Sequence, residues 1–523
     1  MEFINKNILL VAITALLSVI LSIWSIQLDP IVNMDAALYL SAAQEFINGD
    51  IKDAFALYKW PFYSALVAAT HSISGLSIQN SAYLLNTLLQ AIASIGFLAC
   101  VHALGANKRT LIIAALVILF FPSISKYRSF IIRDAGFIAC YLWAIFFLLR
   151  GLNTQQISSF VFSGAAILLG VVFRIEAIAP LAVIPMYLFY LHSKTNIARY
   201  AWLLSTIITS LALFCGLSIW LFGEASTLSS NSISSFFTNS MQHALDSLSS
   251  RVEVIREKVL NILSQQYAPM VLFISVSLIV IYEPIRRLAF FYAYLAWYAI
   301  RHKLVFNKQV IQKTFYALCI IQIALIAIFT TINMFLVSRH TLALVLTILL
   351  LAPFSIEHLL KKWQQRANEA SKSITWKVPI LIILLFAISL EGLDVRTNKH
   401  DIINAGAWVK ETVDPKHSLY SSSGLLMHYA DRKPAYYNLQ FNWKEADFLM
   451  VTNKIFDFDF AVIEIKQSDN SAQDYLNQKL NGEPIAKRNL YSDKLLLIYD
   501  LRKPSQDKPI NKLIDSNYLK IQP

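Results

Sequence analysis

Long apolar segments separated by short polar connections fill the first 395 residues of the chain. A helix needs about 20 predominantly apolar residues to cross the hydrocarbon core of a bilayer. The candidate spans are residues 8–26, 80–104, 111–125, 135–150, 158–173, 177–191, 200–222, 268–283, 314–336, 341–358 and 376–392. The pattern predicts a mainly α-helical, polytopic membrane protein with about eleven transmembrane helices.

The segment 285–301 leaves the number of transmembrane helices open. It is apolar and aromatic, but charged residues stand at both of its ends, namely Arg286, Arg287, Arg301 and His302. Two interpretations fit this pattern. The segment is either an interfacial helix, or part of an extra hairpin that would raise the number of spans to about thirteen.

The last part of the chain, residues 396–523, has a different pattern. Residues 405–412 have the periodicity of a helix, whereas 460–465 and 494–499 alternate or run apolar as strands do. Turns rich in Pro, Asp and Asn separate them. We therefore expect a transmembrane domain over 1–395, with a long first outer loop at 27–79, and a small soluble α/β domain over 396–523.

Composition and charge support the membrane assignment and set an orientation. Hydrophobic residues make up 56% of the chain and charged residues 15%, with a mean hydropathy of +0.52, whereas soluble proteins carry about 25% charged residues. The net charge of +12 resides between the apolar runs, so we expect membrane lipids rather than nucleic acid as partners. Lys and Arg in alternate loops place the N-terminus in the cytoplasm and the C-terminal domain outside.

Several charged residues lie at the predicted outer face, where positive charge is not expected. They are Asp35, Lys59, Lys126, Arg128, Arg133, Asp134, Arg174, Glu176, Arg339 and His340. Cations gathered at one membrane face could bind a lipid phosphate or diphosphate. Two carboxylates, Asp35 and Asp134, could supply a general base or hold a divalent cation, although they do not demand one. The set suggests transfer of a group from a phospholipid-like carrier.

Each of these residues also has a purely structural interpretation. Arg174 and Glu176 could form a local ion pair, and Lys126 and Arg128 could extend to the lipid headgroups. Asp35 could be the N-cap of a helix over 36–47, Asp134 could cap the fourth span, and Lys59 could be an interfacial anchor.

The order of these residues resembles that of the GT-C glycosyltransferases, which use polyprenyl-phosphate sugars and include protein O-mannosyltransferases and bacterial lipid A aminoarabinose transferases. The residues that carry the resemblance are Asp35 in the first loop, Lys59-Trp60-Pro61-Phe62-Tyr63, Asp134 in the second loop, Phe173-Arg174-Ile175-Glu176-Ala177 and Arg339-His340. Ala407-Trp408-Val409-Lys410-Glu411, followed by Asp414-Pro415, resembles the opening of the outer domain in the bacterial branch. Three positions depart from the family pattern, because Trp60 and Ile175 replace prolines and His340 replaces a tyrosine.

The resemblance implies an inverting glycosyltransferase with Asp35 and Asp134 as catalytic residues. It implies that the carrier phosphate is bound by cations drawn from Lys59, Arg174, Arg339, Arg128 and Arg133. It further implies that Tyr39, Glu176 and His340 position the acceptor or donor. A divalent cation, if one is used, would be held by Asp35 and Asp134. No Gly-rich nucleotide-binding loop is visible, which suits a lipid-carried donor.

The resemblance also implies the partners and the location. The donor would be a sugar on a polyprenyl phosphate, and the acceptor a glycolipid, a polysaccharide or a protein. The location would be a bacterial inner membrane with a periplasmic C-terminal domain. Two other classes of protein stay open, namely a transporter or lipid flippase and a non-catalytic scaffold. Transporters tend to have repeated halves and charges near the bilayer midplane, and neither feature is seen in the sequence.

Overall fold

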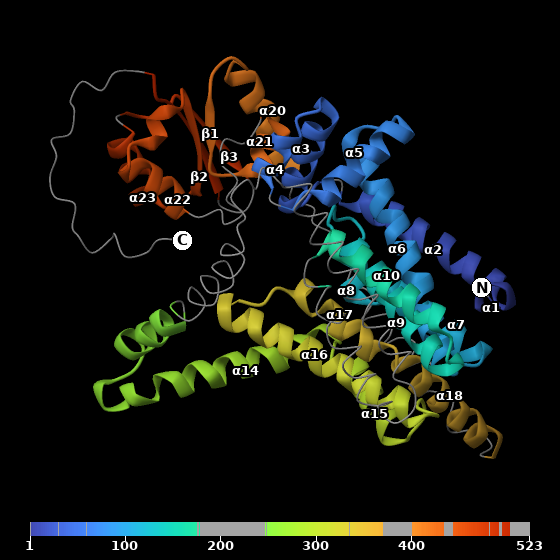
Figure 1. The fold of residues 1–523 in the computed structure, drawn as a ribbon. Helices are drawn as coiled ribbons and strands as arrows, with labels where there is room; N and C mark the ends of the chain where they lie inside the picture. The colour runs from blue at the N-terminus through green and yellow to red at the C-terminus, as the bar shows by residue number, and fades with distance from the viewer. Residues whose placement is uncertain are drawn as a thin grey trace, which may run out of the picture. The chain divides into compact units, whose positions relative to one another are not determined.

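The computed structural model describes residues 2–29, 31–58, 60–174, 177, 246, 248–333, 335–369, 400–432, 443–480, 482–490 and 494–502. Contacts divide the chain into two compact units. The first unit comprises 1–30 and 60–395, and the second comprises 31–59 and 396–523. Figure 1 labels their elements, which are mainly helices in the first unit and a small sheet with helices in the second.

The first half of the helical unit contains α1 (Glu2–Lys6), α2 (Ile8–Leu28), α5 (Phe62–Ser74), α6 (Ile78–Ala103), α7 (Lys108–Phe120), α8 (Pro122–Ser125), α9 (Asp134–Thr154) and α10 (Ile157–Phe173). The second half contains a helix over 248–258, η2 (Ile262–Tyr267), α14 (Ala268–Arg287), α15 (Phe291–Arg301), α16 (Gln309–Asn333), α17 (Ser338–Leu349) and α18 (Ala352–Glu369). Helix α9 packs between α6 and α10, and α17 packs against α14 and α16.

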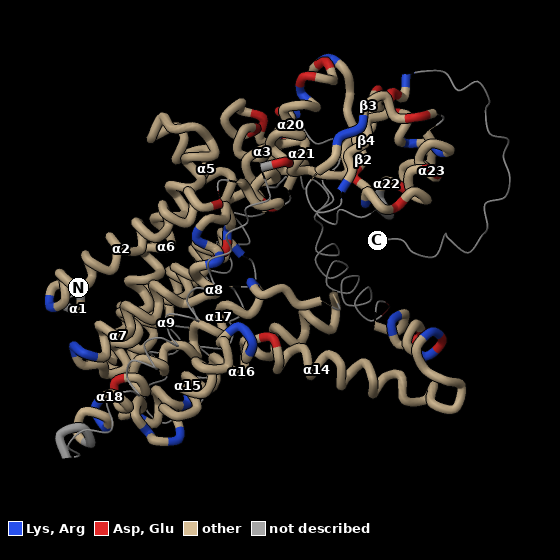
Figure 2. The backbone as a smooth tube through the Cα atoms, turned by 180° about the vertical axis from the view of Figure 1, so that it is seen from behind, with Lys and Arg blue, Asp and Glu red and all other residues tan. Residues whose placement is uncertain are grey.

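Six stretches among the described residues are long and apolar enough to cross a membrane. They are Ile8–Leu28, Ile78–Ala103, Asp134–Thr154, Ile262–Arg287, Gln309–Asn333 and Ser338–Gln365, and Ile157–Phe173 is a shorter apolar helix. Figure 2 shows the long helices tan over most of their length, with blue and red stretches near the ends. The prediction of a polytopic helical membrane protein is confirmed. The predicted spans 200–222 and 376–392, and 177–191 apart from residue 177, lie outside the described residues.

Two predicted segments have different boundaries in the structure. The predicted span 111–125 is broken, since α7 ends at Phe120 and Phe121 is extended in front of Pro122. A residue that precedes proline is pushed out of the helical region, which explains the break. The segment 285–301 is divided between the end of α14 and α15, with a turn at Ala289 and Phe290, whose φ angles are positive.

The second unit contains a four-stranded sheet in the order β1-β2-β4-β3. Its elements are α3 (Met34–Asn48), α4 (Ile51–Leu57), α20 (His400–Thr412), β1 (Leu419–Ser421), α21 (Gly424–Tyr429), α22 (Trp443–Val451), η3 (Lys454–Asp457), β2 (Phe460–Lys466), α23 (Asn470–Lys479), β3 (Ala486–Leu490) and β4 (Lys494–Asp500). Strands β1 and β2 are parallel, and the other pairs are antiparallel. The predicted helix over 405–412 and the strands over 460–465 and 494–499 are confirmed.

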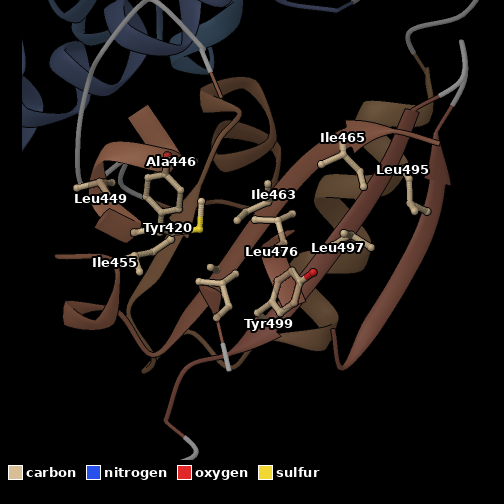
Figure 3. Close-up of a cluster of buried hydrophobic side chains, with 13 residues drawn as sticks. Tyr420, Ala446, Leu449, Ile455, Ile463, Ile465, Leu476, Leu495, Leu497 and Tyr499 are labelled. Carbon is tan, nitrogen blue, oxygen red and sulfur yellow. The ribbon is translucent and has the colours of Figure 1, made fainter. Parts of the chain in front are cut away.

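Helices cover both faces of this sheet, which explains why its central strands are apolar at successive positions. Ile463 and Ile465 of β2 point to one face, where they pack with α22 and α23, as Figure 3 shows. Phe460 and Val462 point to the other face, where they pack with α20 and α21.

Part of the first loop packs with this second unit. Helix α3 contacts α21, and the backbone N–H of Val32 donates a hydrogen bond to the Tyr429 hydroxyl at 3.0 Å. The sequence had assigned this loop, as part of 27–79, to the membrane domain. The structure groups residues 31–59 with residues 396–523.

Candidate functional site

A buried ion pair joins two of the predicted site residues in the helical unit. Asp134 is the first residue of α9, and Arg174 directly follows α10. The Arg174 Nη1 atom pairs with the Asp134 Oδ1 atom, and the exposed fractions of the two side chains are 5% and 2%. This partner of Arg174 therefore lies on another helix. Arg133, and not Asp134, holds the N-cap position of α9, so the predicted capping role of Asp134 is wrong.

Close packing of α9 against α10 fixes the geometry of this pair. A Cβ atom added to Gly136 would lie 2.2 Å from the ring of Phe173. Glycine at this position therefore leaves room for the Phe173 ring against α9, and a methyl group there would require the ring or the helix to move. The Arg174 guanidinium lies 5.7 Å from the centre of the Phe137 ring. The geometry of the pair thus depends on a glycine in the first turn of α9 and on Phe173, the last residue of α10.

Trp60, which lies just before α5, is hydrogen-bonded to the end of α10. Its indole Nε1 donates to the carbonyl oxygens of Val171 and Val172, at 3.2 and 3.1 Å. Lys59, which precedes Trp60 in the sequence, and Glu176 lie outside the described residues.

Two further cations of the helical unit act electrostatically on Asp134 of this pair. The positive charges of Arg339 and Arg133 act on the Asp134 carboxylate together with that of Arg174. Arg339 is the second residue of α17, whose first residue, Ser338, is hydrogen-bonded through its hydroxyl to the Tyr127 hydroxyl. The starts of α9 and α17 therefore contribute to one charged region. The His340 ring lies 4.0 Å from the Phe329 ring.

Tyr127 lies within this region. One of the charges that act on its hydroxyl is that of Arg287, which the sequence did not predict as a site residue. The charges of Arg287, Arg339 and Asp134 all act on the Tyr127 hydroxyl, whose pKa is raised above its usual value mainly by burial. The backbone carbonyl of Arg287 also accepts a hydrogen bond from the Ser123 hydroxyl at 3.1 Å. Arg287 is thus placed beside α8 and the loop that follows it.

The sequence pattern indicates Arg287 as a charged end of the segment 285–301 and not as a site residue. Glu283 pairs with Arg286 at 2.7 Å and with Arg287 at 2.8 Å. A carboxylate three and four residues before two arginines, at the end of an apolar helix, could have indicated a structured charge cluster.

Arg128 has a different environment from the other predicted phosphate ligands. Its Nη1 donates to the Ser18 carbonyl at 3.0 Å and to the Ser18 and Ser22 hydroxyls at 3.1 Å. Its Nη2 donates to the Leu119 carbonyl at 3.4 Å. The residue is 2% exposed and burial lowers its pKa to about 10. The guanidinium therefore links α2 to the end of α7 and does not extend to the lipid headgroups. A phosphate-binding role for it stays a prediction.

Asp35 and Tyr39 belong to the second unit. Asp35 lies in the first turn of α3, and its N-cap is Asn33, so Asp35 is not the cap of a helix over 36–47. Tyr39 is buried, and its ring lies 5.5 Å from the Tyr58 ring. The roles of both residues stay predictions.

Another group of carboxylates lies further along the same segment. Ligand atoms of Glu45, Asp50 and Asp53 lie within 4.8 Å of one another, and Asp50 and Asp53 are exposed. Glu45 is on α3, Asp53 is on α4, and Asp50 lies between the two helices. Glu45 is buried, so the group lies partly beneath the surface.

Comparison with known proteins gives the fold. No family model matches the chain, and no curated protein matches its sequence. Its structure is similar to that of ArnT from Cupriavidus metallidurans in the apo state, with a TM-score of 0.55 and 12% identity over 95% of this chain and 98% of that one. It is also similar to AglB, an archaeal oligosaccharyltransferase from Archaeoglobus fulgidus, in complex with an inhibitory peptide and a dolichol-phosphate. That match has a TM-score of 0.50 and 12% identity, over 92% of this chain and 73% of the other.

A third similar structure is the Archaeoglobus fulgidus oligosaccharyltransferase tethered with an acceptor peptide, with a TM-score of 0.53 and 13% identity over 91% of this chain and 71% of that one. ArnT and AglB are GT-C glycosyltransferases. The chain has the GT-C fold. The resemblance that its motifs suggested is therefore confirmed at the level of the fold.

Proposed function

We propose that this chain is a membrane glycosyltransferase that transfers a sugar from a polyprenyl phosphate to an acceptor on the outer face of the membrane. The proposal rests on the charged region around Tyr127, where the charges of Arg287, Arg339 and Asp134 all act on the Tyr127 hydroxyl, in a chain with the GT-C fold. One of the similar structures, AglB, contains a dolichol-phosphate, which is itself a polyprenyl phosphate.

The arginines of this region suit a leaving phosphate. Guanidinium groups form charge-assisted hydrogen bonds with phosphate oxygens, often two at a time. Arg339 also lies in the first turn of α17, where the backbone N–H groups and the helix dipole favour an anion. Positive charge held ready in this way stabilises the phosphate as its bond to the sugar breaks. We therefore assign the phosphate to Arg287, Arg339 and Arg133.

The Asp134–Arg174 pair has a positioning role in this proposal. Asp134 is buried against Arg174, and a carboxylate neutralised by a guanidinium is a weak base. It therefore holds Arg174 in place and limits the net positive charge of the region. Lys59 is kept as a further phosphate ligand on the strength of the family resemblance.

Asp35 is proposed as the general base, also on the strength of the resemblance. It would take the proton from an acceptor hydroxyl or amine while the acceptor atom bonds to the anomeric carbon. The bond from that carbon to the phosphate oxygen breaks, and the phosphate leaves with the electron pair. Attack from the face opposite the phosphate inverts the stereochemistry. The acceptor is a glycolipid, a polysaccharide or a protein at the outer face of a bacterial inner membrane.

Mass spectrometry of envelope glycolipids and glycoproteins, from cells with and without the chain, tests this function. A sugar mass that is lost without the chain and restored by the wild-type gene would support the proposal and name donor and acceptor. An Asp35→Asn chain should fail to restore it. Identical glycan profiles with and without the chain would contradict the proposal, and full restoration by Asp35→Asn would remove the assigned base.

A further inference from the structure

A cleft with charged and apolar lining residues opens at one end of the sheet in the second unit. It has a volume of about 670 Å³ and is lined by the end of β2, the start of β4, the first half of α23 and one residue of α22. This volume lies within the range of about 300–1,000 Å³ that is usual for small-molecule sites. The second unit therefore has a site of its own, formed entirely by residues that follow β1 in the chain.

The topology of the domain explains the position of the cleft. β2 ends at Lys466, and the chain turns there into α23, which Asp469 caps by accepting from the Ala472 N–H at 3.0 Å. Lys466 is paired in register with Lys494, where β4 begins. The cleft thus lies at the carboxyl end of β2, beyond the residues that pair with β1, where β2 pairs antiparallel with the start of β4.

The lining offers hydrogen-bond donors and acceptors together. The Asp447 carboxylate accepts from the Tyr475 hydroxyl, and the Glu464 carboxylate pairs with the Lys494 ammonium. Burial and the Asp447 carboxylate raise the pKa of Tyr475 to about 12, so its hydroxyl stays a donor at neutral pH. With Asp469 and Lys466 included, the lining contains three carboxylates and two ammonium groups. Such a balance disfavours a polyanion.

Apolar groups complete the lining. Ile465 lies between the charged positions of β2, and Ala472 and the Tyr475 ring come from α23. Figure 3 labels Ile465 and its strand partner Leu495 in the apolar cluster that continues from the cleft into the domain. A sugar ring has apolar C–H faces and hydroxyls that both donate and accept, and an aromatic ring with carboxylates around it matches both properties.

We propose that this cleft binds a saccharide, namely the carbohydrate portion of the acceptor. The identification of this saccharide as part of the acceptor rests on the proposed transferase function, whereas saccharide binding by the cleft does not. The proposal selects a glycolipid or polysaccharide acceptor over a peptide. It also gives the C-terminal domain a substrate-binding role.

Binding of the detergent-purified full chain to an array of immobilised mono- to tetrasaccharides, with acidic and basic peptides on the same array, tests the proposal. Wild type should bind a subset of the saccharides. Asp447→Asn and Tyr475→Ala should each weaken that binding about tenfold or more, because each removes hydrogen bonds to hydroxyls. Asp474→Asn is a matched control, since Asp474 precedes Tyr475 on α23, is exposed and is not among the lining residues.

The outcomes separate this proposal from the proposed transferase activity. Arg339→Gln, at a proposed phosphate ligand in the other unit, should strongly reduce transfer and leave saccharide binding unchanged. Absence of saccharide binding by wild type, equal binding by the cleft variants, or peptide binding that depends on the cleft would each overturn the proposal. Hydrogen exchange over 460–480 identifies a variant that has lost its fold. In that case Glu464→Gln, which keeps the shape of the side chain, replaces the unfolded variant. It should weaken saccharide binding, and binding equal to that of wild type would overturn the proposal.

Discussion

The carboxylate of Asp134 and the guanidinium of Arg174 form an ion pair that is almost completely shielded from water, between the start of α9 and the end of α10. The desolvation of two charges is expensive, and their attraction compensates for it only while both partners are present. The pair therefore ties these helix ends together at the place where other arginines converge.

Removal of one partner should destabilise the protein more than removal of both. Asp134→Asn leaves the Arg174 charge buried without its partner, which we expect to cost about 3–5 kcal/mol. The double variant Asp134→Asn, Arg174→Gln should recover a large part of that loss. Thermal unfolding of the purified variants measures both effects. Losses that simply add in the double variant would show that the two residues are not coupled. All of these variants should lose transfer activity.

Gly136→Ala should disturb the Asp134–Arg174 pair without changing either charged residue. The added methyl would lie 2.2 Å from the Phe173 ring, so the ring or the helix must move. Overpacking of this kind costs about 1–3 kcal/mol. We expect a lower unfolding temperature and reduced transfer. Gly164→Ala on α10 is the control, because a methyl there meets nothing within 4 Å. Equal behaviour of the two variants would show that close approach at Gly136 is unimportant.

The C-terminal domain should lose stability in mild acid through His428. Burial lowers the pKa of His428 below its usual 6.5, against a smaller opposite effect of Asp431. The folded domain therefore binds this proton less readily than the unfolded chain. Its contribution to stability is fully present above pH 6.5 and is lost as the pH falls through the lower folded-state pKa.

Hydrogen exchange over 424–430, measured between pH 5 and pH 7.5, tests this prediction after correction for the intrinsic pH dependence of exchange. Wild type should show weaker protection at the acidic end, and His428→Gln should remove most of that difference. A pH dependence that is the same in both proteins would assign the effect to another group.

The sequence predicts the elements of this fold better than their contacts. The apolar runs predict α2, α6 and α9, because length and hydropathy alone define a span. The alternating segments predict β2 and β4 for a similar reason. Asp134 and Arg174 were both predicted as site residues, since each is a charge at the end of an apolar run. Their pairing depends on the packing of α9 against α10, which a one-dimensional pattern does not contain.

Arg287 and Arg128 show two further limits of the sequence. The sequence pattern places Arg287 only at the charged start of the segment 285–301, whereas the structure places it beside α8 through the contact with Ser123. Arg128 was grouped with the phosphate ligands because it lies in a basic loop. Its environment is set by Ser18 and Ser22, more than a hundred residues earlier in the chain. Contacts at such separations cannot be derived from local spacing.

The binding of undecaprenyl phosphate to the purified chain, measured by thermophoresis, tests the central claim most directly because it does not require the sugar to be known. Wild type should bind this lipid and discriminate against undecaprenol, which lacks the phosphate. Arg287→Gln and Arg339→Gln should each weaken binding about tenfold, since each removes a charge-assisted contact. Arg301→Gln, at the far end of α15 from Arg287, should bind as wild type does. Equal affinity for the phosphate and the alcohol, or variants that bind as tightly as wild type, would contradict a polyprenyl-phosphate site at Arg287 and Arg339.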